Sequence, residues 1–349
     1  MTRTLLLLSA TAMLAACADT DGAPESDAAV EDAGEVNIYS SRHYDTDLAL
    51  YDDFTAETGI AVNRIEAGAD ALIERIANEG EFSPADLLIT VDAGRLWRAE
   101  EAGLLSPVSS EVLMERVPEN LRHPDGLWFG LSKRARVIIN NEDDGVPTPL
   151  ATYEDLADPA HRGEICMRSS SNIYNVSLLA SIIANEGAEA AEEWAEGVVA
   201  NFARAPQGND TSNIGAVASG ECGISVVNTY YLARMASSDD ESDRAEAEAV
   251  GVIFPNQDGS GTHVNISGAG VVANAPNRDN AIRFLEYLTE PSAQRYFANG
   301  NNEYPVVASV EASSAVEALG EFQEDDLNAG ELGRYSAEAV RIFDRVGWP

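Results

Sequence analysis

Residues 86–101 read DLLITVDAGRLWRAEE, a short apolar run that passes directly into an amphipathic one. Residues 86–91 have the length and composition of a buried strand, and residues 94–101 have the apolar spacing of a helix. The same alternation recurs along the chain. Further strands are predicted at residues 36–40, 61–65, 135–140, 164–167, 222–227, 250–254 and 268–273. Further helices are predicted at residues 47–57, 69–79, 173–185, 188–201, 212–219, 278–288 and 293–298. This pattern predicts an α/β fold of βαβ units, in which mostly parallel sheets are flanked by helices.

The predicted strands fall into two groups, and a length of 349 residues is typical of two domains. We expect one lobe to comprise residues 35–136 plus 266–305 and the other residues 137–265 plus 306–349. The chain then crosses twice between lobes, and the two crossover strands form a hinge. Because ligands of α/β lobes bind beyond the carboxyl ends of strands, this arrangement predicts a closable cleft between the lobes.

The charge balance excludes several partners. The chain has 22 basic and 59 acidic residues, a net charge of −37, so nucleic acid and anionic lipid surfaces would repel it. Lys133 is the single lysine. Such an acid-rich, lysine-poor composition is typical of proteins that work in high salt, where screening weakens self-repulsion.

The N-terminal segment is typical of an exported protein. Residues 1–16 have a basic start and an apolar run, as a secretory signal peptide does. The sequence LAAC at residues 14–17 is similar to the bacterial lipobox, which predicts a lipid on Cys17; the alternative is an ordinary signal with a chance cysteine. Residues 17–34 are then an acidic tether. These features predict a periplasmic protein that is anchored to a membrane only through Cys17.

Two cysteines remain, Cys166 and Cys222. In an exported chain an even pair is more often bridged than free, so we expect a disulfide between them. Two buried thiols are the alternative.

Aromatic and polar side chains follow three of the predicted strands. Ser41-Arg42-His43-Tyr44 follows the first, residues 170–175 follow the strand at 164–167, and Asn228-Thr229-Tyr230-Tyr231 follows the strand at 222–227. Three strand ends thus present one histidine and four tyrosines, and no carboxylate. Their joint placement predicts a shared site in the cleft.

Five separated segments, residues 39–44, 86–96, 132–138, 172–175 and 228–231, together resemble the ferric-iron-binding proteins of bacterial ABC importers. The resemblance covers the chain from about residue 35 to 349. It implies a two-lobe periplasmic-binding-protein fold of type II, Fe³⁺ as the cargo, and delivery to an ABC permease in the inner membrane; we expect a monomer. In the most similar subgroup one His and four Tyr hold the iron, and these fall on the following positions: His43, Tyr44, Tyr174, Tyr230 and Tyr231. Another subgroup uses a Glu where this chain has Asp92, one methylene shorter, so Asp92 is not counted as a ligand.

The chemistry of tyrosine agrees with a ferric ligand set. Phenol has a pKa near 10, so ionising each tyrosine at pH 7 costs about 4 kcal/mol, which only a highly charged, hard cation offsets. Four phenolates and Fe³⁺ leave one negative charge. Arg134 or Arg42 is predicted to balance it, unless one tyrosine stays protonated, and Arg134 is the candidate for holding a synergistic anion. The alternative for Arg134 is a surface salt bridge.

The other candidates for chemistry are weaker. His123, His161 and His263 lie in turn-rich contexts and are predicted to be surface residues, whereas Trp128 and Trp194 are predicted to be core. The chain has no GxSxG, GxGxxG, CxxC or HExxH pattern. The sequence therefore favours a substrate-binding protein over an enzyme.

Two rival hypotheses remain. In the first, the same fold binds a polyamine, a thiamine-like cation or an oxyanion, with Asp92 as the counter-charge for a cation. In the second, the protein is an exported mononuclear iron enzyme, although such enzymes usually leave more coordination positions open than five protein ligands do.

Overall fold

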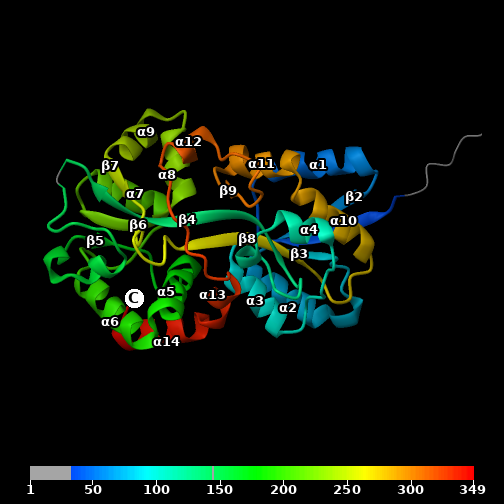
Figure 1. Ribbon diagram of the computed structural model, residues 1–349, viewed down its shortest axis with the longest axis horizontal. Coiled ribbons are helices and arrows are strands. Elements are labelled where there is room, and N and C mark those ends of the chain that lie inside the picture. Colours follow the sequence, from blue (N-terminus) through cyan, green and yellow to red (C-terminus); the bar gives the residue numbers. More distant parts are fainter. Residues whose placement is uncertain (1–32, 144) are drawn as a thin grey trace, which may run out of the picture. The chain divides into compact units, whose positions relative to one another are not determined.

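The computed structural model describes residues 33–143 and 145–349. The predicted signal peptide, Cys17 and all of the tether before residue 33 lie outside this range. The strands are β1 Glu35–Ser40, β2 Ala61–Glu66, β3 Leu87–Thr90, β4 Phe129–Asn141, β5 Ile165–Cys166, β6 Ile224–Asn228, β7 Val250–Ile253, β8 Val264–Val271 and β9 Tyr304–Pro305. The α-helices (Figure 1) are α1 Thr46–Thr58, α2 Ala69–Glu79, α3 Ala93–Glu101, α4 Glu111–Arg116, α5 Ile173–Glu186, α6 Ala188–Ala200, α7 Asp210–Ala218, α8 Thr229–Ala236, α9 Glu241–Glu248, α10 Arg278–Leu288, α11 Pro291–Asn301, α12 Ser314–Glu317, α13 Gly330–Arg334 and α14 Ser336–Val346.

The strands join in the order β2-β1-β3-β8-β4-β6-β5, and β7 and β9 also pair with β4. The α/β class is confirmed, but the expectation of mostly parallel sheets is wrong. Among the described strands, three pairings are parallel (β1 with β2, β1 with β3, β5 with β6) and five are antiparallel. Strand β4 takes part in four of the five antiparallel pairings, and the fifth joins β3 to β8.

Strand β4 passes from one half of the molecule to the other. Its first part pairs with β8, up to the pair Ala135↔Val264, and its second part pairs with β6 and β7, starting at Arg136↔Asn228. Figure 1 shows β4 and β8 side by side through the middle of the molecule. The predicted crossings at residues 136 and 266 fall within these two strands. The lobe boundaries themselves stay a prediction.

Separate hydrophobic cores lie on the two sides of these strands. One core gathers buried residues from 36–131 and 266–332, and defines what we call the first half. Two further cores gather buried residues from 135–250 and 339–348, and define the second half. The C-terminal segment is divided between the halves, because the following side chains pack in the first core: Val306, Val307, Val310, Ala329 and Leu332. Trp128 and Trp194 are buried core residues, as predicted.

The two cysteines of the second half are paired in the structure. A disulfide joins Cys166 at the end of β5 to Cys222 just before β6, with their Cα atoms 5.8 Å apart. The bridge lies in one of the second-half cores and ties β5 to the strand that leads to Tyr230.

The prediction that His161 and His263 are surface residues is wrong. They are 0% and 3% exposed, because tertiary packing covers the turns in which they lie, which local sequence does not reveal. His161 Nε2 lies 2.9 Å from Thr148 Oγ1. His123 is partly buried beside Glu100, with Nε2 3.1 Å from a carboxylate oxygen.

His263 predicts an acid sensitivity of folding. Burial, together with the charges of Arg136 and Arg134, lowers the pKa of His263 to about 3. An unfolded chain protonates this histidine near its ordinary pKa of about 6.5, so between these values the unfolded state binds the extra proton. Stability should therefore fall as pH falls below 6.5, with a slope that approaches about 1.4 kcal/mol per pH unit. Urea unfolding at pH 7 and pH 4.5 should show a smaller difference for His263→Gln than for the wild type; equal differences would contradict this.

Candidate metal centre

Tyr230 and Tyr231 occupy the first turn of α8. Strand β6 ends at Asn228 and α8 begins at the next residue, so no loop separates the strand from the helix. The two rings have centroids 4.3 Å apart. Tyr230 is 4% exposed, and Tyr231 is half-buried. This strand-to-helix junction fixes both tyrosines at the end of a buried strand.

Tyr174 lies in the first turn of α5, next to Tyr230. The side chain of Asn172 caps the helix by accepting a hydrogen bond from the backbone N–H of Tyr174, at 3.1 Å. The hydroxyl of Tyr230 donates to the hydroxyl of Tyr174 across 3.2 Å. Three phenols from two helices of the second half are thus gathered.

Tyr44 and His43 come from the first half, in the segment between β1 and α1. Arg234 connects them to the other tyrosines: its guanidinium carbon lies 6.0 Å from the ring centroid of Tyr44, 5.7 Å from that of Tyr230 and 5.8 Å from that of Tyr231. The structure therefore brings all four tyrosines together. His43 is more peripheral: it is exposed and stacks on Tyr44, with ring centroids 5.6 Å apart.

The buried phenols are held in their neutral form. Burial raises the pKa of Tyr44, and the Glu303 carboxylate raises it further. Burial and the neighbouring Tyr231 raise the pKa of Tyr174. Burial and the neighbouring phenols raise the pKa of Tyr230 well above its ordinary value. At neutral pH these three side chains are hydroxyls, and a cation that binds them as phenolates must displace their protons.

Three arginines surround the ring of Tyr174. The guanidinium carbons of Arg134, Arg136 and Arg168 lie 5.8, 5.9 and 5.3 Å from its centroid. Two buried carboxylates face them: Asp210 pairs with Arg136 and Arg168, and Asp92 lies 4.0 Å from Arg134. Three positive and two negative charges leave one positive charge in excess.

The alternative of a surface salt bridge for Arg134 is wrong, because this residue is only 3% exposed. Arg42, the other sequence candidate for charge balance, pairs with Asp47 and Glu303, each at 2.9 Å, in a buried cluster. Its guanidinium carbon also lies 4.9 Å from the ring centroid of Tyr44. Both sequence candidates therefore lie beside phenols, Arg42 beside Tyr44 and Arg134 beside Tyr174.

Several polar atoms around Tyr174 have no hydrogen-bond partner among the described residues. They are Arg134 Nη1, Arg136 Nε, Arg168 Nε and Asn228 Nδ2, and all are buried. Leaving buried donors unpaired is costly, which is why such groups are usually satisfied in the functional state. Unpaired cationic donors of this kind can hold an anion.

Sequence reasoning missed Arg136, Arg168 and Arg234. Arg136 was detectable, because residues two apart on a strand share a face and Arg134 was already a candidate. Arg168 directly follows a predicted strand. Arg234 comes four residues after Tyr230, a spacing that places both on one face of a helix.

Asp92 does not face the phenols as a free carboxylate. It is completely buried and caps α3, with Oδ1 accepting from the backbone N–H of Gly94 at 2.8 Å. Its Oδ2 accepts from Ser177 at 2.9 Å and from Asn265 at 2.8 Å. These hydrogen bonds agree with leaving Asp92 out of the ligand set.

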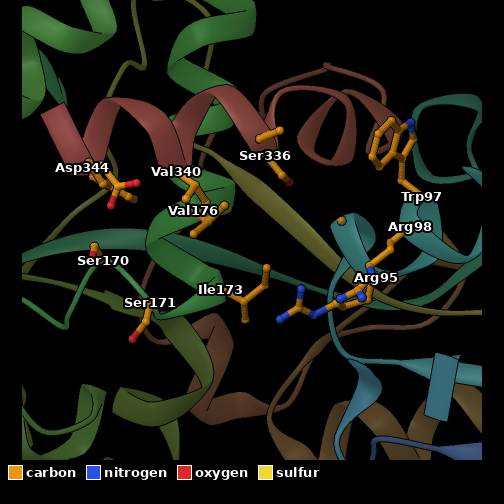
Figure 2. Close-up of a pocket in the computed structure, with 13 residues that line it drawn as sticks. Arg95, Trp97, Arg98, Ser170, Ser171, Ile173, Val176, Ser336, Val340 and Asp344 are labelled. Atoms are coloured by element: carbon orange, nitrogen blue, oxygen red, sulfur yellow. The ribbon is translucent and has the colours of Figure 1, made fainter. Parts of the chain in front are cut away.

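A cavity of about 450 Å³ opens between α3, α5 and α14 (Figure 2). Arg95 and Trp97 of α3, Ile173 and Val176 of α5, and Val340 of α14 are among its lining residues. None of the five predicted ligands lines it, within the part of the chain that the structure describes. The same range contains no group of three or more His, Cys, Asp or Glu side chains placed to hold a metal ion. The tyrosine cluster therefore stays the candidate centre.

Comparison with known proteins agrees with this geometry. The model of the bacterial extracellular solute-binding protein family matches residues 82–321. Iron uptake protein A1 of Synechocystis sp. is 53% identical over 336 residues, which cover 96% of this chain and 93% of that protein. The structure of Trichodesmium IdiA (FutA) in complex with iron and citrate ligands is 57% identical, covers 90% of this chain and 100% of that one, and superimposes with a TM-score of 0.87. The ferric binding protein of Campylobacter jejuni is 42% identical, with the same coverage and a TM-score of 0.83. The chain therefore belongs to the bacterial extracellular solute-binding protein family, with the two-lobe α/β fold of type II and in the group of ferric-iron-binding proteins.

Proposed function

We propose that this protein captures Fe³⁺ between its two halves and delivers it to an ABC permease for import. The observation that carries the proposal is the convergence of four tyrosines from three strand ends: Tyr44 from the first half, and Tyr174, Tyr230 and Tyr231 from the second. His43 completes the set. Its Nδ1 lies 3.3 Å from the carbonyl oxygen of Ser41, and donation to this carbonyl leaves Nε2 for the metal.

The chemistry of this set favours a trivalent cation. Each phenol costs about 4 kcal/mol to ionise at pH 7 even with its ordinary pKa, and burial adds to that cost for Tyr44, Tyr174 and Tyr230. Mg²⁺ and Ca²⁺ are usually held by carboxylates, carbonyls and water, and Zn²⁺ by Cys, His and carboxylate. Hard phenolate oxygens suit Fe³⁺.

The arginines balance the remaining charge. Four phenolates and Fe³⁺ sum to one negative charge, and the surplus positive charge beside Tyr174, together with the guanidinium of Arg234, offsets it. When a tyrosine stays protonated, or an open coordination position remains, a synergistic anion fits the same place. Arg134, with its unpaired Nη1, is the residue that we expect to hold it.

The rival ligands have less support. An organic cation needs a carboxylate within reach of the aromatic walls, and Asp92, the candidate for that role, is buried and hydrogen-bonded. An iron enzyme needs open coordination positions, and five protein ligands leave few. We therefore infer that the protein binds and releases its cargo without chemical turnover.

Binding between two halves suits a closing motion. We infer that residues 35–136 plus 266–305 and residues 137–265 plus 306–349 move as lobes about β4 and β8, except that the stretch up to Leu332, which packs in the first core, moves with the first lobe. We also infer that the permease distinguishes the closed, loaded form. The proposal includes a periplasmic monomer held to the membrane by a lipid on Cys17. No helix within residues 33–143 and 145–349 is long and apolar enough to cross a bilayer.

A titration tests the proposed cargo. Metal-free protein mixed with ferric citrate should develop a visible phenolate-to-iron absorption band that saturates at one iron per chain. Spermidine, added to a second sample in a calorimeter, should give no binding heat. A colourless iron titration together with spermidine heat would replace Fe³⁺ by the polyamine.

A further inference from the structure

Asp92 joins four elements at one buried point. It caps α3, accepts hydrogen bonds from Ser177 of α5 and Asn265 of β8, and lies 4.0 Å from Arg134 of β4. Arg134 also donates to the carbonyl oxygen of Val91, the residue before Asp92. The strands β4 and β8 are the two that cross between the halves. The carboxylate therefore lies beside the two crossing strands and makes specific contacts with each of these four elements.

The hydrogen bond from Ser177 to Asp92 connects the two halves directly. The neighbours of Asp92 in β3 and α3, such as Leu88 and Leu96, pack in the first core. The neighbours of Ser177 in α5, Val176 and Leu178, pack in the second. Both members of the hydrogen bond are completely buried. Figure 2 shows α3 and α5 on the walls of one cavity, which is the seam that this contact bridges.

The same helix carries a candidate iron ligand. Tyr174 lies three residues before Ser177, so the two side chains share a face of α5. A separation of the halves that moved α5 away from α3 would break the contact between Ser177 and Asp92. A contact of this kind would stabilise the state in which the halves are together and would hold the N-terminal turn of α5 in place.

We propose that Asp92 is a positioning residue: through Ser177 it latches the closed conformation and sets Tyr174 against the first half. This inference rests on the proposed function. It assigns to Asp92 a part in retaining iron without contact with the metal.

The test compares two serines of one helix. Ser177→Ala removes the donor to Asp92, whereas Ser181→Ala, the control, removes an equally buried hydroxyl that donates to the Leu178 carbonyl within α5. For the iron-loaded chains, release of iron to EDTA should be about tenfold faster or more in Ser177→Ala, the loss expected for a buried hydrogen bond to a carboxylate. The visible band should keep its position, because the ligands are unchanged. Small-angle scattering of the metal-free chains should give a larger radius of gyration for Ser177→Ala than for Ser181→Ala.

Asp92→Asn provides a second arm. If Asp92 and Ser177 act through the hydrogen bond between them, the double variant Asp92→Asn with Ser177→Ala should release iron little faster than the faster-releasing single variant. Equal radii and equal release rates for Ser177→Ala and Ser181→Ala would overturn the latch. A wild-type chain that takes up no iron would overturn the proposed function instead, and the scattering comparison would still decide whether the latch exists.

Discussion

Replacing Tyr230 and Tyr231 together by phenylalanine is expected to weaken the visible ferric band strongly, because only the phenolates of Tyr44 and Tyr174 remain, and to weaken iron binding by more than about 100-fold. Losing an outer-shell partner of a metal ligand commonly costs 10–100-fold in affinity, and this double variant removes two ligands. Phenylalanine keeps the packing of the two rings, whose centroids are 4.3 Å apart. The melting temperature of the metal-free protein should move little, because the lost hydrogen bond from Tyr230 to Tyr174 is a neutral one.

Tyr296→Phe serves as the control for that experiment. Tyr296 is a partly buried tyrosine of the first half whose hydroxyl bonds to Asp53, and it takes no part in the cluster. Its replacement should leave the ferric band and the affinity unchanged. Unaltered iron binding by the double variant of Tyr230 and Tyr231 would refute their assignment as iron ligands.

Arg42→Met is expected to cost about 3–5 kcal/mol of folding stability, the usual penalty for removing one partner of a buried ion pair. Arg42 lies 2.9 Å from both Asp47 and Glu303, and its Nη1 also donates to Ser267 of β8 at 2.9 Å. Without the guanidinium, two buried carboxylates lose their counter-charge. Urea denaturation of the metal-free protein measures the loss. Because Tyr44 follows two residues later, ferric affinity should fall as well.

Arg345→Met is the matched control for Arg42→Met. Arg345 also pairs with two carboxylates, those of Glu192 at 2.6 Å and Glu338 at 3.2 Å, but on the surface. Exposed pairs are screened by solvent, so its loss should barely shift the urea midpoint. Equal midpoint shifts for the two variants would show that the buried cluster around Arg42 has no special role in stability.

The sequence was sufficient for much of the strand–helix alternation and for the gathering of the tyrosines. It did not predict the helices α4, α8, α9, α12, α13 and α14. Strand ends are recognisable locally, and the carboxyl ends of strands meet at a cleft, so the sequence alone places Tyr174, Tyr230 and Tyr231 together. Pairing direction could not be predicted in the same way. The sequence pattern identifies only residues 135–140 of β4 as a strand, and which strands lie beside β4 depends on how the chain crosses between the halves.

Burial of polar residues could not be predicted from the sequence either. His263 follows a turn-rich stretch, and its backbone hydrogen bonds with the Tyr153 hydroxyl and the Arg136 N–H join it to distant parts of the chain that meet it only after folding. Arg136 likewise has no local mark of being buried. Its companions Asp210, Asn175 and Asn228 come from distant parts of the chain, so the network that satisfies it exists only after folding.

The direct passage from β6 into α8, with no loop between them, has a consequence for the energetics of iron binding. Three phenol oxygens lie on helix starts that are fixed to the second half, so they need no ordering when a metal arrives. Loss of conformational entropy is then expected mainly at His43 and Tyr44, because Arg42 beside them is already held by its buried ion pairs. Substitutions next to these two residues should therefore change the affinity while leaving the three phenols of the second half in place.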